Sequence, residues 1–390
     1  MKLRKKINIS VVCYALAYAM FVLSLFYKDV SAPEVLERVA SVGKYASVGF
    51  LIVGALYNAY TKKQLVWIMG LLIVDALLLI KTGVLLFITI TLFTYLALNI
   101  KDRESIKIAF CTLIIYTVAT LLLCKFGVFE NLITRRWPDS PKRYTFGFYH
   151  SNVLPLIYSY LVAYSLLLMK KNMNIIGAVL LIIVDLYIYK FCGSRNALIV
   201  VILLVVGKLI VDTSWFGRIK NVVNKPLRII AVVCIPVLTI ATLGIALLLN
   251  KYSVLKKIDF ICSYRFTYIS MKIQKLGLSL LPAMTTNEYF KDEVVIDNGY
   301  AYVAIRYGIV MIIILSIIVC GLVKKYKNNS LVLGVIILVV IQNLIDNDLL
   351  DYSCLPFLIL GLKNIVGEKK YGRIGKRNNE CIQRNRIGTK

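Results

Sequence analysis

The stretch that decides the fold is Ile229–Leu249, which reads IIAVVCIPVLTIATLGIALLL and carries no charged side chain. A helix needs about 20 apolar residues to cross a hydrocarbon core of about 30 Å, so this stretch predicts a membrane-spanning helix. Comparable runs occur at Ile9–Phe26, Tyr45–Tyr60, Leu65–Ile80, Gly83–Ile100, Ile106–Phe126, Val153–Met169, Ile175–Phe191, Ala197–Val211, Gly299–Val323, Leu331–Leu344 and Leu350–Ile365. We therefore expect an all-α polytopic membrane protein with about twelve transmembrane helices.

The composition excludes a water-soluble globular protein. Hydrophobic residues make up 59% of the 390 residues and the mean hydropathy is +0.77, whereas soluble domains are about half apolar. The nine cysteines are scattered without a CxxC pair, and the chain has one histidine. A zinc site or a disulfide framework is therefore not expected, and we predict neither a metal nor a cofactor.

Basic residues orient the predicted helices. Four of the first six residues are Lys or Arg, which predicts a cytoplasmic N-terminus in the cell membrane by the excess of positive charge on that side. Alternation from this start puts the short basic connections on the same side, at Lys62-Lys63, Lys101/Arg103/Lys107, Lys170-Lys171, Arg218/Lys220/Lys225/Arg228 and Lys324-Lys325/Lys327. The sequence thus predicts a membrane domain over residues 1–366 and a basic cytoplasmic tail over residues 367–390.

The formal net charge of +27 is explained by this topology and by contact with anionic membrane lipids. Nucleic-acid binding is not expected, because no compact domain gathers the basic residues.

Two long segments are expected on the outer face, at residues 127–151 and 250–298. Long loops on a rigid scaffold often carry binding and catalytic groups. Apolar residues from Val254 to Leu276 follow helical spacing, which predicts one amphipathic helix on the outer surface, ending near Pro282. Arg265 lies in its apolar stripe and either binds an anion or reaches water or lipid head groups.

Several ionisable residues lie within or beside predicted spans. Asp75, Asp185, Lys190 and Arg306 all fall in the outer half of the bilayer, which indicates a polar cavity open to the outside. Asp346-Asn-Asp348 at the last outer turn is only superficially similar to a DxD metal site, because nucleotide sugars are absent outside the cell.

The only histidine, His150, follows Arg143 in a polar outer loop. An imidazole titrates near neutral pH, so His150 is a candidate acid or base. The alternative is a hydrogen-bonded loop residue without a chemical role.

Four local patterns then occur in order on the predicted outer face. They are Phe146-Gly-Phe-Tyr-His-Ser-Asn152, Gly193-Ser-Arg-Asn-Ala197, Ser263-Tyr-Arg265 with Tyr268-Ile269, and Asp297-Asn-Gly-Tyr300 leading to Tyr307-Gly-Ile309. With these patterns, the span count and the large late outer loop, nearly the whole chain resembles the Wzy-type polysaccharide polymerases of the O-antigen polymerase and ligase superfamily. Asp297 stands where ligases usually have histidine, which favours polymerase over ligase.

The resemblance implies that the protein joins oligosaccharide repeat units carried on undecaprenyl diphosphate, by metal-independent inverting transfer on the outer face of the membrane. It also implies a flippase and a chain-length regulator of the same pathway as partners. We assign Arg195 and Arg265, with Arg143 as a third member, to the diphosphate, since guanidinium groups stabilise its growing negative charge.

The acceptor hydroxyl needs a base, for which Asp297 and His150 are the candidates. Asn152, Asn298 and Tyr300 are assigned to the sugars. Two alternative functions remain from the sequence: an O-antigen-type ligase, and a flippase or transporter for lipid-linked oligosaccharide.

Overall fold

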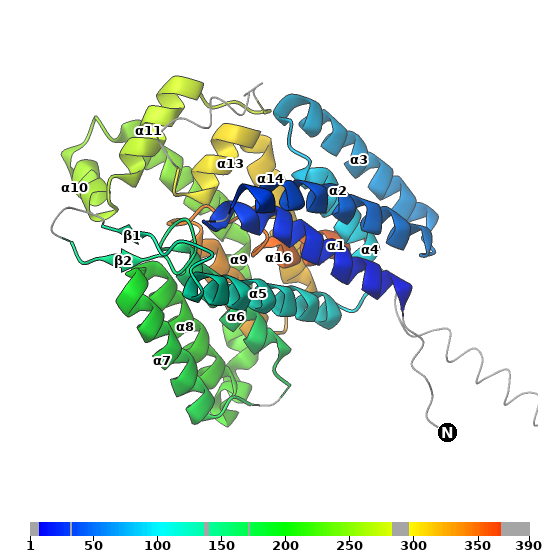
Figure 1. The fold of residues 1–390 in the computed structure, drawn as a ribbon, viewed down its shortest axis with the longest axis horizontal. Helices are drawn as coiled ribbons and strands as arrows, with labels where there is room; N and C mark the ends of the chain where they lie inside the picture. The colour runs from blue at the N-terminus through cyan, green and yellow to red at the C-terminus, as the bar shows by residue number, and fades with distance from the viewer. Residues whose placement is uncertain (1–7, 32, 136–139, 171, 283–295, 368–390) are drawn as a thin grey trace, which may run out of the picture.

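The computed structural model describes residues 8–31, 33–135, 140–170, 172–282 and 296–367, and these form a bundle of helices (Figure 1). The only strands in these ranges are β1 (Ile133–Thr134) and β2 (Arg143–Tyr144), which pair as an antiparallel hairpin. The helices are α1 (Ile9–Phe26), η1 (Tyr27–Asp29), α2 (Glu34–Leu56), α3 (Lys62–Thr82), α4 (Leu86–Ala97), α5 (Asp102–Lys125), α6 (Val153–Leu168), α7 (Ile175–Cys192), α8 (Arg195–Val211), α9 (Ser214–Leu248), α10 (Ser253–Ile261), α11 (Arg265–Leu276), α13 (Gly299–Tyr307), α14 (Ile309–Lys325), α15 (Ser330–Gln342) and α16 (Leu355–Val366).

Within the described ranges, six helices are long and apolar enough to cross a membrane. They are α1 extended through η1, α2 from Leu36, α3, α5, α7 and α9. Four shorter apolar helices of 10–17 residues, α4, α6, α15 and α16, accompany them. The described chain is an all-α membrane protein, as predicted, and the count of twelve spans stays a prediction.

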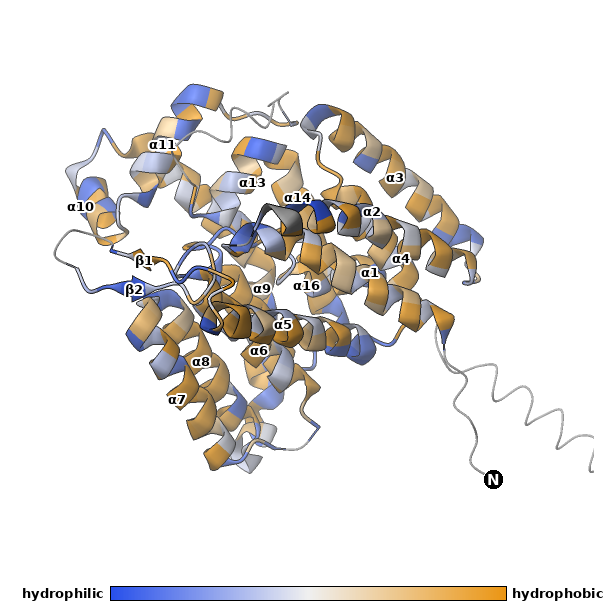
Figure 2. Ribbon diagram, in the orientation of Figure 1, coloured by the Kyte–Doolittle hydropathy of each residue, from blue (hydrophilic) through white to orange (hydrophobic). Residues whose placement is uncertain are grey.

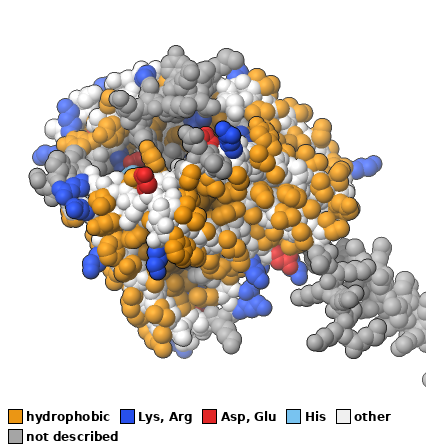
Figure 3. All heavy atoms as spheres, in the orientation of Figure 1, with side chains coloured by type: hydrophobic (Ala, Val, Ile, Leu, Met, Phe, Trp, Pro, Cys, Tyr) orange, Lys and Arg blue, Asp and Glu red, His pale blue; other side chains and the backbone are white. Residues whose placement is uncertain are grey.

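Apolar side chains also cover the outside of the bundle. Large hydrophobic residues are exposed along α3, such as Leu77 and Ile80, and along α7, such as Leu180 and Ile183. Figure 2 shows α3, α7 and α8 as mainly hydrophobic ribbons, and Figure 3 shows orange side chains over much of the visible face. A large apolar exterior of this kind is typical of a protein surrounded by lipid.

One end of the bundle, which we call the hairpin end, carries β1–β2, α10 and α11 (Figure 1). Hydrogen bonds join connecting segments that are distant in sequence there. The amide of Tyr149 donates to the carbonyl of Asp29 at 2.7 Å, and the Tyr352 hydroxyl donates to the Asp29 carboxylate at 2.7 Å. The Asn298 amide donates to the Leu344 carbonyl at 2.8 Å. Asp29, Tyr149 and Asn298 lie in segments predicted on the outer face, and Leu344 and Tyr352 lie at the adjoining ends of predicted spans.

The opposite end joins segments that were predicted on the inner face. Gln64, at the start of α3, donates to the Gly367 carbonyl at 2.7 Å. Lys363 of α16 donates to Asp102 of α5 at 2.8 Å, and Lys325 of α14 pairs with the same carboxylate. The two groups of connections therefore separate to the two ends of the bundle as the alternating topology requires.

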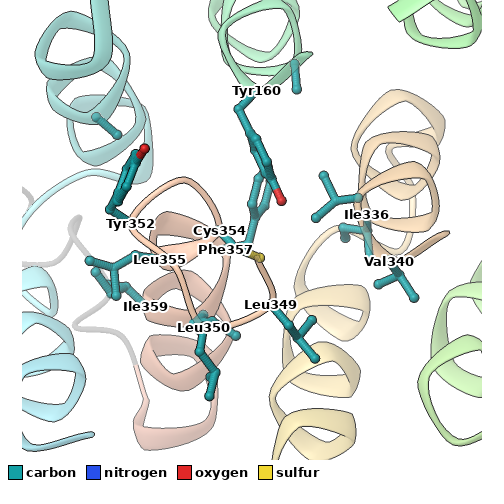
Figure 4. Close-up of a cluster of buried hydrophobic side chains, with 14 of the residues drawn as sticks. Tyr160, Ile336, Val340, Leu349, Leu350, Tyr352, Cys354, Leu355, Phe357 and Ile359 are labelled. Carbon is teal, nitrogen blue, oxygen red and sulfur yellow. The ribbon is translucent and has the colours of Figure 1, made fainter. Parts of the chain in front are cut away.

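The core is a continuous cluster of buried apolar and tyrosine side chains. Figure 4 shows Leu349, Leu350 and Tyr352 of the α15–α16 connection among Tyr160 of α6 and Val340 of α15. The connection is thus anchored in the core although it lies at the hairpin end.

Two glycines bring α14 and α16 into close contact. A Cβ added at Gly361 would lie 2.5 Å from the Ile318 carbonyl oxygen, and one at Gly321 would lie 2.8 Å from the Gly361 carbonyl oxygen. Small residues at a helix interface allow the backbones to approach in this way.

The single continuous helix predicted at Gly299–Val323 is wrong, because Gly308 separates α13 from α14. Gly308 has φ +84, and an added Cβ would lie 2.6 Å from the Leu280 carbonyl oxygen. The Ile309 amide donates to Ser279 at 3.0 Å and the Val310 amide to Leu280 at 3.1 Å. A distant segment therefore accepts the hydrogen bonds that the interrupted helix lacks.

The single amphipathic helix predicted from Val254 to Leu276 is also wrong, because Ser263 and Tyr264 separate α10 from α11. Both residues have positive φ, +60 and +61. The predicted inner connection around Arg218–Arg228 is helical and forms the start of α9. The predicted tail at 367–390 lies outside the described residues, apart from Gly367.

Candidate functional site

A cavity of about 400 Å³ lies at the hairpin end, lined by five separate parts of the sequence. These are the start of α6, the α7–α8 turn, the α10–α11 pair, the residue before α13 and the α15–α16 connection. Its polar lining residues are Asn152, Ser194, Arg195, Asn196, Ser263, Arg265, Asn298 and Asp346. The cavity therefore combines two cations, one acid and several hydrogen-bonding groups.

Arg195 is the first residue of α8 and is exposed at the cavity. In the described part of the chain its guanidinium has no hydrogen-bond or ion-pair partner. Ser194, the residue before it, makes no side-chain cap with the helix. The N-terminus of a helix carries partial positive charge and unpaired amides, so α8 adds to the attraction of Arg195 for an anion.

Arg265 is the first residue of α11, and its position depends on Asp259 of α10. The buried Asp259 carboxylate accepts hydrogen bonds from the amides of Phe266 at 2.8 Å and Thr267 at 3.3 Å. It also accepts the Thr267 hydroxyl at 2.5 Å. Asp259 therefore caps α11 across the break between the two helices and holds Arg265 at the cavity wall.

Asp346 supplies the acid of the cavity. Its carboxylate accepts a hydrogen bond from the Asn196 amide at 2.6 Å, which links the α15–α16 connection to the start of α8. Burial raises the pKa of Asp346 to about 6, and the neighbouring Asp297 raises it further, while Asn196 and Arg265 oppose the shift. A carboxylate with such a pKa is suited to accept a proton near neutral pH.

The two predicted catalytic residues do not line the cavity. Asp297 lies beside it, where its carboxylate is 4.0 Å from the Arg265 guanidinium and its side chain is 55% exposed. His150 is exposed, and its Nδ1 accepts a hydrogen bond from the Asn152 amide at 3.1 Å. Asp297 therefore lies within ion-pair distance of a cavity cation, whereas His150 contacts the cavity residue Asn152.

Arg143 was predicted as a third cation on the diphosphate, but its guanidinium donates hydrogen bonds to other residues of the protein. Its Nε donates to the Cys192 carbonyl at the end of α7 at 2.5 Å, and a terminal nitrogen donates to the Asn152 side chain. Gly193 makes room for it: φ is +70, and an added Cβ would lie 3.0 Å from Arg143 Nε. Arg143 therefore joins β2, α7 and the cavity residue Asn152 without lining the cavity.

Of the three predicted sugar-binding residues, two line the cavity and one is buried in the core. Asn152 and Asn298 line the cavity. The Asn298 carboxamide is already committed, because its oxygen accepts the Ala301 amide at 2.9 Å and its nitrogen donates to Leu344. Tyr300 is fully buried and its hydroxyl donates to the Val340 carbonyl. A sugar contact by Tyr300 is incompatible with this position in the core.

The sequence reasoning did not assign a role to Asn196 or Asp346. Asn196 lies in the Gly193–Ala197 run that the sequence analysis singled out. Its hydrogen-bond partner Asp346, however, is 150 residues away in the sequence. Asp346 was noticed as an acid of the last outer turn, without a catalytic role. No group of three or more His, Cys, Asp or Glu side chains in the described ranges is arranged to hold a metal ion.

Comparisons with protein families, with curated proteins and with solved structures found no significant match.

Proposed function

We propose that the protein is a polysaccharide repeat-unit polymerase of the Wzy type, acting on the outer face of the cytoplasmic membrane. It transfers a glycan chain from undecaprenyl diphosphate to the terminal sugar of another lipid-linked repeat unit. The observation that carries the proposal is the shared cavity of Arg195 and Arg265, with Asp346 in the same wall.

The two arginines suit a lipid diphosphate because they come from different helix N-termini. A guanidinium binds phosphate oxygens through two parallel hydrogen bonds. Arg195 has no protein partner among the described residues, and the contact of Arg265 with Asp297 is long, at 4.0 Å. Both cations are therefore available to an anion, whereas Arg143 is not.

In the proposed reaction, the bond between the anomeric carbon and the diphosphate oxygen breaks, and its electron pair leaves with undecaprenyl diphosphate. Arg195 and Arg265 stabilise the negative charge that develops there. The acceptor hydroxyl oxygen forms the new glycosidic bond, and its proton passes to the Asp346 carboxylate. Attack opposite the leaving group inverts the anomeric centre, and the reaction requires no cofactor.

Asp346 replaces Asp297 and His150 as the favoured base because it lines the cavity and has the raised pKa. Asp297 is better suited to orient Arg265, and Asn152 to bind a sugar. Membrane lipids remain the expected surroundings, and a flippase and a chain-length regulator remain the proposed partners.

We also infer about twelve crossings, with the hairpin end outside and both termini in the cytoplasm. The six long helices and six shorter units (α4, α6, α8, α13 with α14, α15 and α16) give this total. The basic residues at the opposite end support the orientation.

The test is complementation of a strain that lacks its own polymerase. Arg195→Ala and Arg265→Ala should each abolish polymer while the protein stays in the membrane, and Arg218→Ala at the opposite end should leave chain length unchanged. In the Arg195→Ala and Arg265→Ala strains, single repeat units should be displayed outside the cell. Units trapped inside would indicate a flippase, full-length chains that fail to attach would indicate a ligase, and normal polymer in both variants would refute the cavity as the site.

A further inference from the structure

A second cavity of about 400 Å³ lies at the same end of the bundle, between α1, α2, the start of α4 and α13. Three cations line it: Lys28 of η1, Lys44 of α2 and Arg306 of α13. Glu37 and Asp351 are the acids in its lining. Among the described lining residues the cations therefore outnumber the acids, and the proposed reaction has not yet used this cavity.

The cations of this second cavity differ in how firmly they are held. Arg306 lies 5.5 Å from the ring centres of both Tyr302 and Tyr307, which places its guanidinium among aromatic faces. Lys28 and Lys44 have no hydrogen-bond or ion-pair partner among the residues that the structure describes. Burial raises the pKa of Asp351 well above its usual value, and the neighbouring Lys28 opposes this shift.

The second cavity also has an apolar part, which suits a hydrocarbon chain, beside hydroxyl groups such as those of Ser24 and Ser41. Phe21 and Leu25 of α1 face it together with Leu85 and Leu86 before and at the start of α4. Cations above apolar side chains form a surface that matches a lipid with a phosphate head. A free sugar or a soluble anion would not use the apolar part.

Two structural elements connect the second cavity to the first. Asn298 lines the first and Arg306 lines the second. They are eight residues apart along α13, or about 12 Å at 1.5 Å per residue. Asp346 and Leu350 line the first and second cavities respectively, and four residues of chain span at most about 14 Å.

Joining two lipid-linked glycans requires two diphosphates on the protein at the same time. The acceptor sugar must reach the first cavity while its own diphosphate stays one repeat unit away. We propose that the second cavity binds the prenyl diphosphate of the acceptor, an inference that rests on the proposed polymerase function.

The core supports a fixed separation between the two sites. The α15–α16 connection contributes to both cavities, and its Leu349, Leu350 and Tyr352 are anchored in the core (Figure 4). The wall between the sites is therefore a rigid part of the bundle. It sets the distance between donor and acceptor diphosphates.

The experiment is native mass spectrometry of the full-length protein in detergent with farnesyl diphosphate as a short-chain probe. Wild type should bind two equivalents. Lys28→Gln/Lys44→Gln should bind one, Arg195→Gln/Arg265→Gln should bind one, and the combined variant none, each lost site being weakened about tenfold or more. Lys62→Gln/Lys63→Gln, which removes two exposed lysines at the opposite end, should still bind two.

The outcomes separate this proposal from the one before it. Two equivalents on the Lys28/Lys44 variant, or one on wild type that only the arginine variant loses, would overturn the acceptor site and leave the first cavity as proposed. Two equivalents on the arginine variant would overturn the first cavity instead, and no binding to wild type would overturn both. Inorganic pyrophosphate or phosphatidylglycerol bound equally well at the Lys28/Lys44 site would replace the acceptor with a simple anion or a structural phospholipid.

Discussion

The side-chain amide of Asn196 donates a hydrogen bond of 2.6 Å to the carboxylate of Asp346, so that the start of α8 and the α15–α16 connection meet at the first cavity. The contact orients Asp346, which is the only acid among the described residues that line this cavity.

Asp346→Asn should abolish polymerisation without unfolding the protein. Loss of a general base lowers rates by about 10²–10⁴-fold, while asparagine keeps the shape of the side chain. Because burial raises the pKa of Asp346 to about 6, wild-type activity should fall as the pH drops through about 6. A polymerisation assay with purified lipid-linked repeat units across this range measures both effects, and an unchanged rate at pH 5 would contradict the role of Asp346.

The same pKa predicts the sign of a stability difference. The folded protein binds the Asp346 proton more tightly than the unfolded chain, whose carboxyl has the ordinary pKa of 3.8. This stabilisation is complete below about pH 4 and is lost as the pH rises through about 6. As the pH rises from about 4 to about 6, the free energy of unfolding should therefore fall less for Asp346→Asn than for wild type. Thermal unfolding in detergent at several pH values measures this difference.

Asp259 is predicted to act on Arg265 by positioning. Asp259→Ala removes the acceptor for the first amides of α11 and should cost about 0.5–2 kcal/mol of stability. It should also weaken the binding of farnesyl diphosphate at the first cavity, and Asp259→Asn, which keeps an acceptor oxygen, should restore much of it. If the effects of Asp259→Ala and Arg265→Ala on this binding were simply additive, the proposed coupling would be wrong.

The contact between α14 and α16 predicts opposite effects of one substitution at two glycines. Gly361→Ala should destabilise the protein by about 1–3 kcal/mol, because the new Cβ would lie 2.5 Å from the Ile318 carbonyl oxygen. Gly334→Ala in α15 meets nothing within 4 Å and should stabilise the helix by about 0.5–1 kcal/mol. Equal shifts in the unfolding temperature of the two variants would show that the close contact between α14 and α16 at Gly361 does not limit the stability of the protein.

The ion cluster at the opposite end should matter for stability and not for polymerisation. Asp102 binds Lys363, whose side chain is only 3% exposed, and also Lys325, which is 15% exposed. Asp102→Ala leaves a buried lysine without its carboxylate and should cost about 3–5 kcal/mol. Lys325→Ala keeps the buried pair and should cost less, and both variants should polymerise at the wild-type rate while folded.

Much of the helical framework followed from the sequence. The predicted span Ile9–Phe26 coincides with α1, and the span Ala197–Val211 begins two residues after α8 does. Long apolar runs bounded by charged or small residues are strong local signals. The grouping of connections at two ends followed from the basic residues in the same way.

The two breaks in the helices were not predictable from local patterns, because they depend on contacts that form only in the folded protein. Gly308 looks like an ordinary glycine in an apolar run, and only the backbone of Leu280 against it explains the interruption. The break at Ser263 and Tyr264 likewise depends on the cap that Asp259 provides.

The site was predictable to the extent that its cations lie in recognisable sequence patterns. Arg195 and Arg265 line one cavity, whereas Arg143 and Tyr300 are held elsewhere. Their local sequences did not reveal this difference, because it depends on the carbonyl groups of Cys192 and Val340. The choice of Asp346 as the acid of the cavity required its pairing with Asn196.

The length of α9 has a consequence for how the protein must be handled. Its 35 residues extend over about 52 Å at 1.5 Å per residue, well beyond a hydrocarbon core of about 30 Å. Pro226 lies between the early turns with Arg218 and Lys220 and the uncharged run from Ile229, and proline is a common cause of helix bending. In the proposed orientation these early turns project into the inner head-group layer, so reconstitution in purely zwitterionic vesicles would deprive them of their counter-ions.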